Sequence, residues 1–576
     1  MRRTNILLLI FTLFFCFCNS PEKENAKQNF VSIRASQDPE NLNPVNYNSA
    51  LSSEIINLLY QSLLTIDPES KQIKPLLAVD LPLVTKSDSQ SVFTFRIHPA
   101  ARWADNKIVS GEDVAFSLKL LRGPLLNNQR TAERFFFIKD IELDERDKSV
   151  IRLICDKYNS EMDLMTGDFA VLPRHLVDPK GLLTSFSFKE LTLKYDSLAD
   201  NPKIKEFAEW FNSDRFTRNK QFLKGSGGYE LDAWNTGQFV RLKKKQNWWG
   251  DKPKVANSFL KAHPERITYH IIPENATALM QLRSQQLDVY PSLPITAYQQ
   301  LAQDKSFTQH YNLYTPESYY FSYMGLNGRS LKFEDVRTRQ ALAYLLDVDL
   351  LIKATQSGFA TRTVGPVIPS DNRFYNSAIK PYTYNLEKAK ALLSAAGWEK
   401  KEDSWQKRLN GEWVPLTINL NYKAGDTELQ NIALIFKQAA AKANIPVNIE
   451  PMEGLLLTNK LKSHDFDMFI RWLSGNQFVF NYKTILHTES ATEGGGNYTG
   501  FGTPESDQLI DLINETSDLR EKAKLLKEFQ AILHEQSNLI FLYFSKERIA
   551  VHNRFKNTKI SGIKPGYDVS AFTLKE

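Results

Sequence analysis

Between residues 385 and 474, segments with strand character alternate with segments of helical periodicity, and the links between them are short. The pattern predicts strands at 416–420, 446–449 and 466–472, and helices at 386–396, 427–443 and 455–462. We expect Asn385 to cap the first helix, and Thr427 with Gln430 to form a capping box at the second. This alternation favours a parallel α/β layer with right-handed crossovers.

The end of the last predicted strand of this layer is where we expect a ligand. In open α/β sheets, ligands bind beyond the carboxyl ends of the strands. Here the strand ends at Trp472, and Gly475 and Asn476 follow it. Two interpretations of Trp472 stay open, a ring that lines the ligand cleft and a side chain that fills the core, and we favour the cleft.

An aromatic stretch precedes this layer in the chain. Residues 319–347 begin as a strand, break at Asn327-Gly328, and continue as a helix whose first turn carries Glu334 and Asp335. Successive side chains of a strand point to opposite faces. We therefore expect one of Tyr319 and Tyr320 to face the cleft and the other to face the core.

The same stretch closely resembles the family 5 solute-binding proteins, which are the peptide-, nickel- and dipeptide-binding components of bacterial ABC importers. The residues that carry the resemblance are Asn327, Phe333, Asp335, Val336-Arg337, Gln340-Ala341-Leu342 and Asp347. The segments 101–121, 172–179 and 224–249 are also similar to the family. The likeness covers nearly all of the chain after its first residues.

The resemblance implies an α/β fold of the two-lobed periplasmic-binding-protein type (type II, with an extra domain in the N-terminal lobe), its lobes joined by hinge strands. The length agrees, because 576 residues exceed what one hydrophobic core usually serves. We expect a signal peptide at 1–18, a flexible tether at 19–30, an N-terminal lobe at 31–315 with its extra subdomain at about 62–165, a second α/β lobe at 316–487, and a return to the N-terminal lobe at 488–576.

The first residues are expected to direct the protein out of the cytoplasm. Arg2-Arg3 is followed by an apolar run, 6–17, that is too short to span a bilayer. The run resembles a lipoprotein signal with Cys18, or less well Cys16, as the acylated residue, although a phenylalanine precedes each cysteine where the usual signal has a small residue. We expect a lipid-anchored protein of the periplasm or cell envelope; ordinary secretion with cleavage elsewhere is the alternative.

The resemblance implies that the protein captures peptides, or a peptide-like solute, and delivers them to the permease subunits of a transporter. Peptide-binding relatives have a W-x-x-D pattern whose aspartate pairs with the ammonium of the peptide, and Gly475 takes that position here. A buried ammonium without an anionic partner costs several kcal/mol. Either Asp38 or Glu40 in an early loop supplies the charge, or the ligand has no free amine, as in a metal chelate or another nutrient.

Composition and motifs give other classes little support. The net charge is +6 and no basic block stands out beyond Lys243-Lys244-Lys245, so nucleic-acid binding is not expected. The chain has no H-E-x-x-H, no G-x-S-x-G elbow and no nucleophilic cysteine, since Cys155 is expected to be buried and inert. We expect a monomer without metal, cofactor or catalytic residues. An exported hydrolase and a surface lipoprotein that contacts other proteins but imports nothing are the rival hypotheses.

Overall fold

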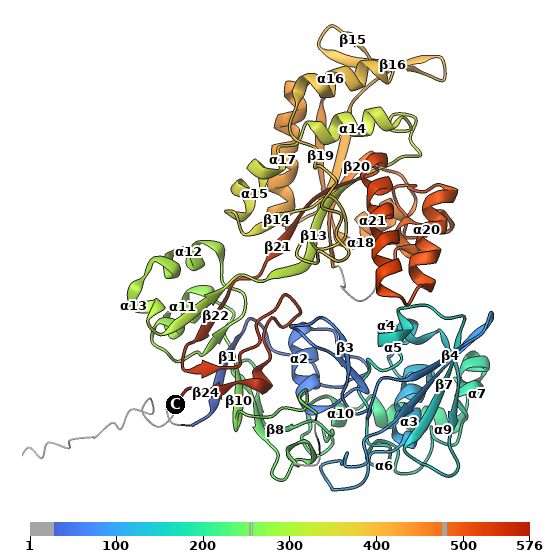
Figure 1. The fold of residues 1–576 in the computed structure, drawn as a ribbon, viewed down its shortest axis with the longest axis vertical. Coiled ribbons are helices and arrows are strands. Elements are labelled where there is room, and N and C mark those ends of the chain that lie inside the picture. The colour runs from blue at the N-terminus through green and yellow to red at the C-terminus, as the bar shows by residue number, and fades with distance from the viewer. Residues whose placement is uncertain (1–27, 253–254, 256, 475–480) are drawn as a thin grey trace, which may run out of the picture.

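The computed structural model describes residues 28–252, 255, 257–474 and 481–576. Figure 1 shows two halves, one above the other, which are joined on one side by strands. We call the lower half the first lobe and the upper half the second lobe.

The first lobe is built on a seven-stranded sheet whose strands come from both ends of the chain. In spatial order they are β12 (Tyr311–Tyr314), β22 (Ile549–His552), β11 (Val289–Tyr290), β1 (Phe30–Ala35), β10 (Arg266–Ile271), β9 (Phe239–Lys244) and β8 (Tyr229–Asn235). β1 runs parallel to both β10 and β11, with Ile33 opposite Tyr269 and Val289. Ile33 is buried in one core with Ile55 of α2 (Ala50–Leu59). The β11–β12 end packs against α11 (Asn275–Arg283), α12 (Ile295–Gln303) and α13 (Lys305–Thr308).

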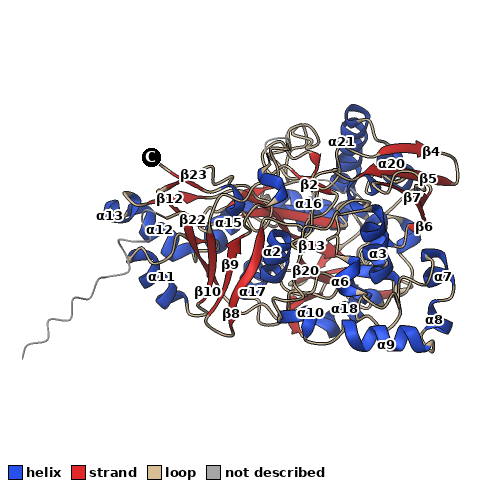
Figure 2. Cartoon of the chain, turned by 90° about the horizontal axis from the view of Figure 1, so that it is seen from below, coloured by secondary structure: helices blue, strands red, loops and turns tan. Residues whose placement is uncertain are grey.

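A four-stranded antiparallel sheet forms the other side of the first lobe. Its order is β4 (Leu83–Lys86), β5 (Gln90–Arg96), β7 (Val150–Asp156) and β6 (Ile138–Leu143), all within the span 62–165 expected for an extra subdomain. Alternating residues of β5, Phe93 and Phe95, are buried in the same core as Val114 and Leu118 of α3 (Gly111–Arg122). Figure 2 shows α3 and several short helices beside this sheet. The smaller elements of the lobe are β2 (Leu64–Ile66), β3 (Ile73–Pro75), α4 (Gln129–Ala132), α5 (Met162–Met165), α6 (Arg174–Val177), α7 (Phe188–Leu193), α8 (Tyr195–Leu198), α9 (Pro202–Phe211), α10 (Arg215–Arg218), β23 (Phe555–Lys556) and β24 (Thr573–Leu574).

The second lobe is built on a six-stranded mixed sheet. Its order is β14 (Ala360–Arg362), β21 (Leu539–Lys546), β13 (Glu317–Leu326), β20 (Met468–Ser474), β18 (Ile418–Lys423) and β19 (Val447–Met452). β18 pairs in parallel with both β19 and β20, which confirms the expected parallel layer, while β13 and β21 add antiparallel strands. Above it lies a small sheet of β15 (Glu399–Lys401), β16 (Ser404–Leu409) and β17 (Glu412–Pro415).

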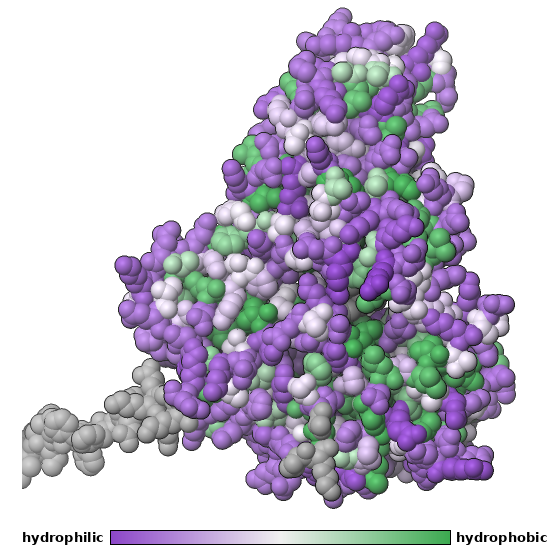
Figure 3. All heavy atoms as spheres, viewed as in Figure 1, coloured by the Kyte–Doolittle hydropathy of each residue, from purple (hydrophilic) through white to green (hydrophobic). Residues whose placement is uncertain are grey.

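Helices cover both faces of the six-stranded sheet. One face packs against α14 (Val336–Tyr344), α15 (Val348–Gln356), α16 (Leu386–Ala395) and α17 (Thr427–Lys442). The opposite face packs against α18 (Gly454–Lys462), α20 (Pro504–Glu515) and α21 (Leu519–Gln536). In the part of the chain that the structure describes, no helix has the length and apolar character needed to cross a bilayer, and hydrophilic side chains cover most of the face in Figure 3.

Within the described residues the chain crosses between the lobes twice, and the two crossings run side by side. β12 leads into β13, and β21 leads into β22; Tyr314 pairs with Ile549 below the crossings and Glu317 with Lys546 above them. We propose these two connections as the hinge. The expected return to the first lobe at residue 488 is wrong, because the apolar faces of α20 and α21 pack on the second-lobe sheet and β21 is one of its strands. The chain returns only after Lys546.

Candidate functional site

The strand order of the second-lobe sheet reverses at β18, which makes the carboxyl end of this strand a topological switch point. From β18 the chain passes through α17 to β19 on one side, and then through α18 to β20 on the other side. α17 packs on one face of the sheet and α18 on the opposite face. In such sheets ligands bind where the strand order reverses, beyond the carboxyl ends of the strands. Ser474, at the carboxyl end of β20, pairs with Tyr320 near the hinge end of β13, so this position lies next to the hinge.

Two aromatic rings form what we call the aromatic wall at this position, Tyr320 and Trp472. Their ring centroids are 6.5 Å apart at an interplanar angle of 49°. Tyr320 is 46% exposed and Trp472 is half-buried, with Tyr543 of β21 packed edge-on against it at 5.9 Å. The wall is thus held from behind by the sheet and is open to solvent at Tyr320.

Tyr319 lies on the opposite face of β13, where it packs against the core shared with α18, α20 and α21. Burial raises the pKa of the Tyr319 hydroxyl, and the nearby carboxylates of Asp371 and Glu317 raise it further. Tyr319 and Tyr320 therefore point to different faces, and only Tyr320 shares a face with Trp472. Their roles in binding stay predictions.

The carboxylate of Glu428, which the sequence analysis does not predict as a site residue, lies behind the aromatic wall. Glu428 lies in the first turn of α17, and its Oε1 accepts a hydrogen bond from the Tyr543 hydroxyl at 2.6 Å and another from the Gln356 amide. Burial raises the pKa of Glu428, and the two hydrogen bonds oppose that shift. The sequence signal for Glu428 is an acidic residue soon after the end of a predicted strand. This signal is not specific, because acidic residues are common in the first turn of a helix, where they interact favourably with the backbone dipole.

The two acids proposed from the sequence serve the first lobe. Asp38 accepts hydrogen bonds from the Trp234 indole at 2.8 Å and from the backbone amide of Gly237, so it fastens the β8–β9 hairpin. Glu40 is exposed and accepts a hydrogen bond from the Asn48 amide. Within the described ranges, no contact joins either carboxylate to the aromatic wall. Gly475, Asn476 and Cys18 lie outside the described residues.

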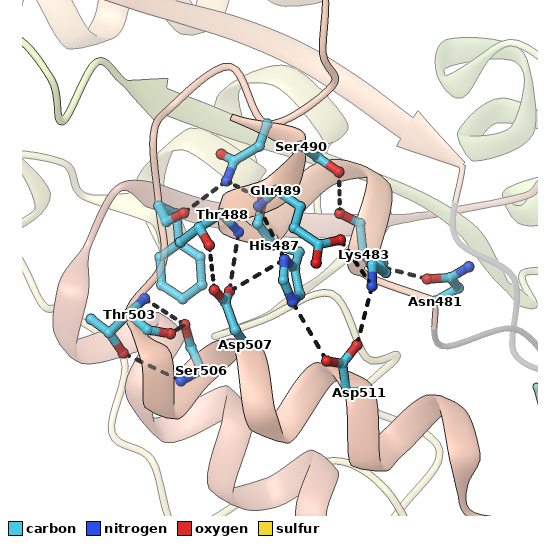
Figure 4. A network of polar contacts seen from close by, with 12 residues as sticks. Asn481, Lys483, His487, Thr488, Glu489, Ser490, Thr503, Ser506, Asp507 and Asp511 are labelled. Atoms are coloured by element: carbon cyan, nitrogen blue, oxygen red, sulfur yellow. Dashed lines mark hydrogen bonds and ion pairs between the residues drawn. The ribbon is translucent and has the colours of Figure 1, made fainter. Parts of the chain in front are cut away.

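A polar network anchors the chain that follows the site (Figure 4). Lys483 in α19 (Lys483–Leu486) reaches Glu489 at 3.0 Å and Asp511 of α20 at 3.5 Å. His487 is buried and lies 3.7 Å from Asp507 and 3.7 Å from Asp511. Among the described residues, no group of three or more His, Cys, Asp or Glu side chains could hold a metal ion. We interpret the network as an anchor, because its ion pairs join α19 and the residues after it to α20.

Two lobes joined by a pair of strand connections are the architecture of a two-lobed binding protein. The family model for bacterial extracellular solute-binding proteins, family 5 (middle), matches residues 72–493, and the chain belongs to this family. Its members are substrate-binding proteins and not enzymes, which confirms the prediction that this chain is not an enzyme.

Relatives extend over the whole chain. It is 22% identical over 585 residues to the oligopeptide-binding protein AppA of Bacillus subtilis, which covers 99% of this chain and 97% of the relative. It is 24% identical over 522 residues to the dipeptide-binding protein of Escherichia coli, which covers 88% of each chain. Among solved structures, the periplasmic EDTA-binding protein EppA superposes with a TM-score of 0.74 at 19% identity, covering 96% of this chain and 97% of that one. At this identity the structural likeness shows the fold alone.

Proposed function

We propose that this protein is the substrate-binding component of an ABC importer, which captures peptides between its lobes and delivers them to membrane permease subunits. The observation that carries the proposal is the aromatic wall of Tyr320 and Trp472, at the switch point of the second-lobe sheet and beside the hinge. Ligand sites of this kind are concave and mostly apolar, with a few polar groups that fix orientation. The names of the curated relatives support peptides as the ligand class.

Three carboxylates are candidates for the negative charge that would bind the ammonium group of a peptide. Glu428 is held against the aromatic wall through Tyr543, whereas Asp38 and Glu40 lie in the first lobe. We propose Glu428 as the first candidate, because both hydrogen bonds printed for its carboxylate go to Oε1 and its burial disfavours an uncompensated negative charge.

A ligand without a free amine is the second candidate. It is favoured by Gly475 in the position where peptide-binding relatives have an aspartate. The solved structure of an EDTA-binding protein with this fold supports a chelate as this second ligand class.

The experiment is a thermal-shift and calorimetric screen of the purified protein. The panel contains free di- to nonapeptides, nickel with histidine, and nickel with EDTA. The peptide proposal predicts that at least one peptide raises the melting temperature and binds saturably at one site. A rise with a chelate but with no peptide favours the second candidate and contradicts the first.

We also propose that the protein is exported and anchored by acylation of Cys18, with residues 19–30 as the tether. Metabolic labelling with a tritiated fatty acid tests this proposal. Cys18→Ser is expected to abolish the label and Cys16→Ser to leave it. Loss of the label only in Cys16→Ser would move the anchor to Cys16, and an unlabelled wild type would favour ordinary secretion.

A further inference from the structure

A cavity of about 620 Å³ lies in the first lobe, at one end of the β8–β9 hairpin. Glu230, near the start of β8, pairs with Lys243, near the end of β9, and both line the cavity. Asp38 binds the opposite end of the same hairpin, at its turn. The volume lies within the range of about 300–1,000 Å³ that is usual for small-molecule sites. The basic run Lys243-Lys244-Lys245, which stands out in the sequence, forms part of the cavity wall.

Positive charge dominates the lining of this cavity, which we call the basic pocket. Among the described residues, its lining holds one acid, Glu230, and the basic side chains of Arg102, Lys243, Lys244, Lys245 and Lys252. Two of the lysines have acidic partners, since Lys243 lies 3.3 Å from Glu230 and Lys244 lies 2.9 Å from Asp251. The other three basic side chains form no ion pair in the part of the chain that the structure describes. Because like charges repel, a bound anion would stabilise this arrangement.

The ammonium group of Lys245 is held by the glycine-rich turn that precedes β8. Its Nζ donates hydrogen bonds to the carbonyl oxygens of Gly225 at 2.6 Å and Gly227 at 2.7 Å. These bonds use two of the three N–H groups of an ammonium, and neither acceptor carries a charge. Burial lowers the pKa of Lys245 to about 7; the charge of Glu230 opposes this shift and that of Lys224 adds to it. An anion in the basic pocket would favour the protonated form of Lys245.

The basic pocket lies at the end of the seven-stranded sheet where β1 begins. Phe30 of β1 is opposite Arg266 of β10, and Arg266 is opposite Lys243 of β9. Neighbouring strands are about 4.8 Å apart, so the start of β1 lies roughly 10 Å from Lys243. This end of the sheet faces away from the hinge, because β1 runs parallel to β11, β11 runs antiparallel to β22, and β22 begins at the hinge. In Figure 1, β8 and β10 lie in the lower part of the first lobe.

We propose that the basic pocket binds the phosphate group of an anionic phospholipid at the membrane surface. The choice of a lipid rests on the proposed export and acylation of Cys18. An extended chain spans about 3.3–3.6 Å per residue, so the segment from Cys18 to Phe30 reaches about 40 Å at most. An acylated Cys18 would therefore keep this end of the first lobe close to the headgroups. Guanidinium and ammonium groups donate strong hydrogen bonds to phosphate oxygens, and the contact would leave the second lobe free to move.

The test measures vesicle binding by the mature chain from residue 19, which has no acyl group and keeps every described helix and strand. It is sedimented with vesicles of equal parts phosphatidylglycerol and phosphatidylcholine, or of phosphatidylcholine alone. We expect binding only to the anionic vesicles, and weaker binding as sodium chloride is added. Each basic residue near an anionic membrane strengthens binding about 5-fold, so Lys243→Gln with Lys252→Gln should weaken it by about 25-fold. The control, Lys353→Gln with Lys437→Gln, removes two exposed lysines of α15 and α17 and should bind as the wild type does.

The outcomes separate this inference from the proposed function. No binding to anionic vesicles, or equal binding to both kinds of vesicle, overturns the phospholipid site. An equal loss in the two double variants means that only the net charge matters, and also overturns it. Saturable binding of inorganic phosphate in a calorimetric titration, without vesicle binding, overturns the assignment to a lipid. Because the chain tested has no acyl group, each of these failures leaves acylation of Cys18 and peptide binding standing, while an unlabelled wild type in the fatty-acid experiment overturns the anchor itself.

Discussion

The backbone amide of Ser160 in the first lobe donates a hydrogen bond of 2.8 Å to the carbonyl oxygen of Asn514 in the second lobe. Beside it, Lys157 pairs with Glu515, and the Asn481 amide donates to Glu161 at 2.9 Å. Figure 1 shows these elements on the side away from the hinge, where α20 stands above α4 and α5. The lobes are therefore joined by the two chain crossings at the hinge, and by non-covalent polar contacts on the side away from it.

Reversing one charge of this contact should favour the open arrangement of the lobes. Lys157→Glu places two carboxylates together, and exposed pairs of this kind contribute about 0.2–1 kcal/mol. We expect peptide affinity to fall by about 2- to 5-fold, and the radius of gyration from X-ray scattering to increase. Lys157→Glu with Glu515→Lys should restore both values. A double variant that behaves like the single one would show that the pair does not hold the lobes together.

The aromatic wall should carry much of the binding energy. The few hot-spot residues of a binding site, among which tryptophan is enriched, cost about 2 kcal/mol or more when they are truncated, so Trp472→Ala is expected to weaken binding of the best peptide by about 30-fold or more. Trp413→Ala, in the small sheet above the lobe and 44% exposed, is the control and should bind as the wild type does. Unchanged affinity in Trp472→Ala would place the ligand elsewhere.

Glu54 makes stability depend on pH. Its Oε1 accepts hydrogen bonds from the hydroxyls of Tyr269 at 2.9 Å and Tyr567 at 2.8 Å, and burial raises its pKa to about 7. The folded carboxyl therefore holds its proton more tightly than the unfolded one. The resulting stability is fully present below about pH 4.5 and is lost as the pH rises towards 7.

Glu54→Gln should remove this dependence, because an amide fills the same space without a charge. We expect it to be about 1–3 kcal/mol more stable than the wild type at pH 8 and similar at pH 4.5. Urea unfolding at the two pH values measures the difference, with the exposed Glu412→Gln as control. An equal pH dependence in Glu54→Gln and the wild type would mean that Glu54 ionises freely.

The C-terminal segment packs closely against the hinge at Gly562. A Cβ at this position would lie 1.6 Å from the carbonyl oxygen of Glu317, at the start of β13. Gly562→Ala must therefore displace backbone, and we expect a loss of at least about 1–3 kcal/mol in unfolding free energy. Gly454→Ala, where the nearest atom is a lysine side-chain carbon at 3.6 Å, should be neutral. Equal melting temperatures for the two variants would contradict this packing.

Local patterns predicted the second-lobe layer well, because its strands and helices each have a strong period and a clear end. Asn385 caps α16 as expected, accepting a hydrogen bond from the Lys388 amide at 2.9 Å. The expected capping box of Thr427 with Gln430 is wrong by one residue. Asp426 caps α17, since its carboxylate accepts from the amides of Glu428 and Leu429, and a carboxylate is also favoured by the helix dipole.

Long-range relationships could not be predicted in this way. Nothing local in α20 and α21 shows which sheet their apolar faces cover, so the sequence predicts the return to the first lobe too early in the chain. The charge of Asp38 makes it a candidate from the sequence, but the sequence does not reveal that the Trp234 indole, 196 positions away, donates a hydrogen bond to its carboxylate. Arg102 and Lys243 line one cavity only because the fold brings their distant segments to the same end of the β8–β9 hairpin.

The most direct test of the account is calorimetric titration of the purified protein with the peptide panel. We predict saturable binding of at least one peptide at a single site. At a hundredfold excess over the dissociation constant, such binding would stabilise the fold by about 2.7 kcal/mol. The absence of binding by every peptide would contradict the claim that the two lobes close on a peptide. A heat signal that never saturates, because the peptide is being consumed, would contradict the claim that it is released unchanged.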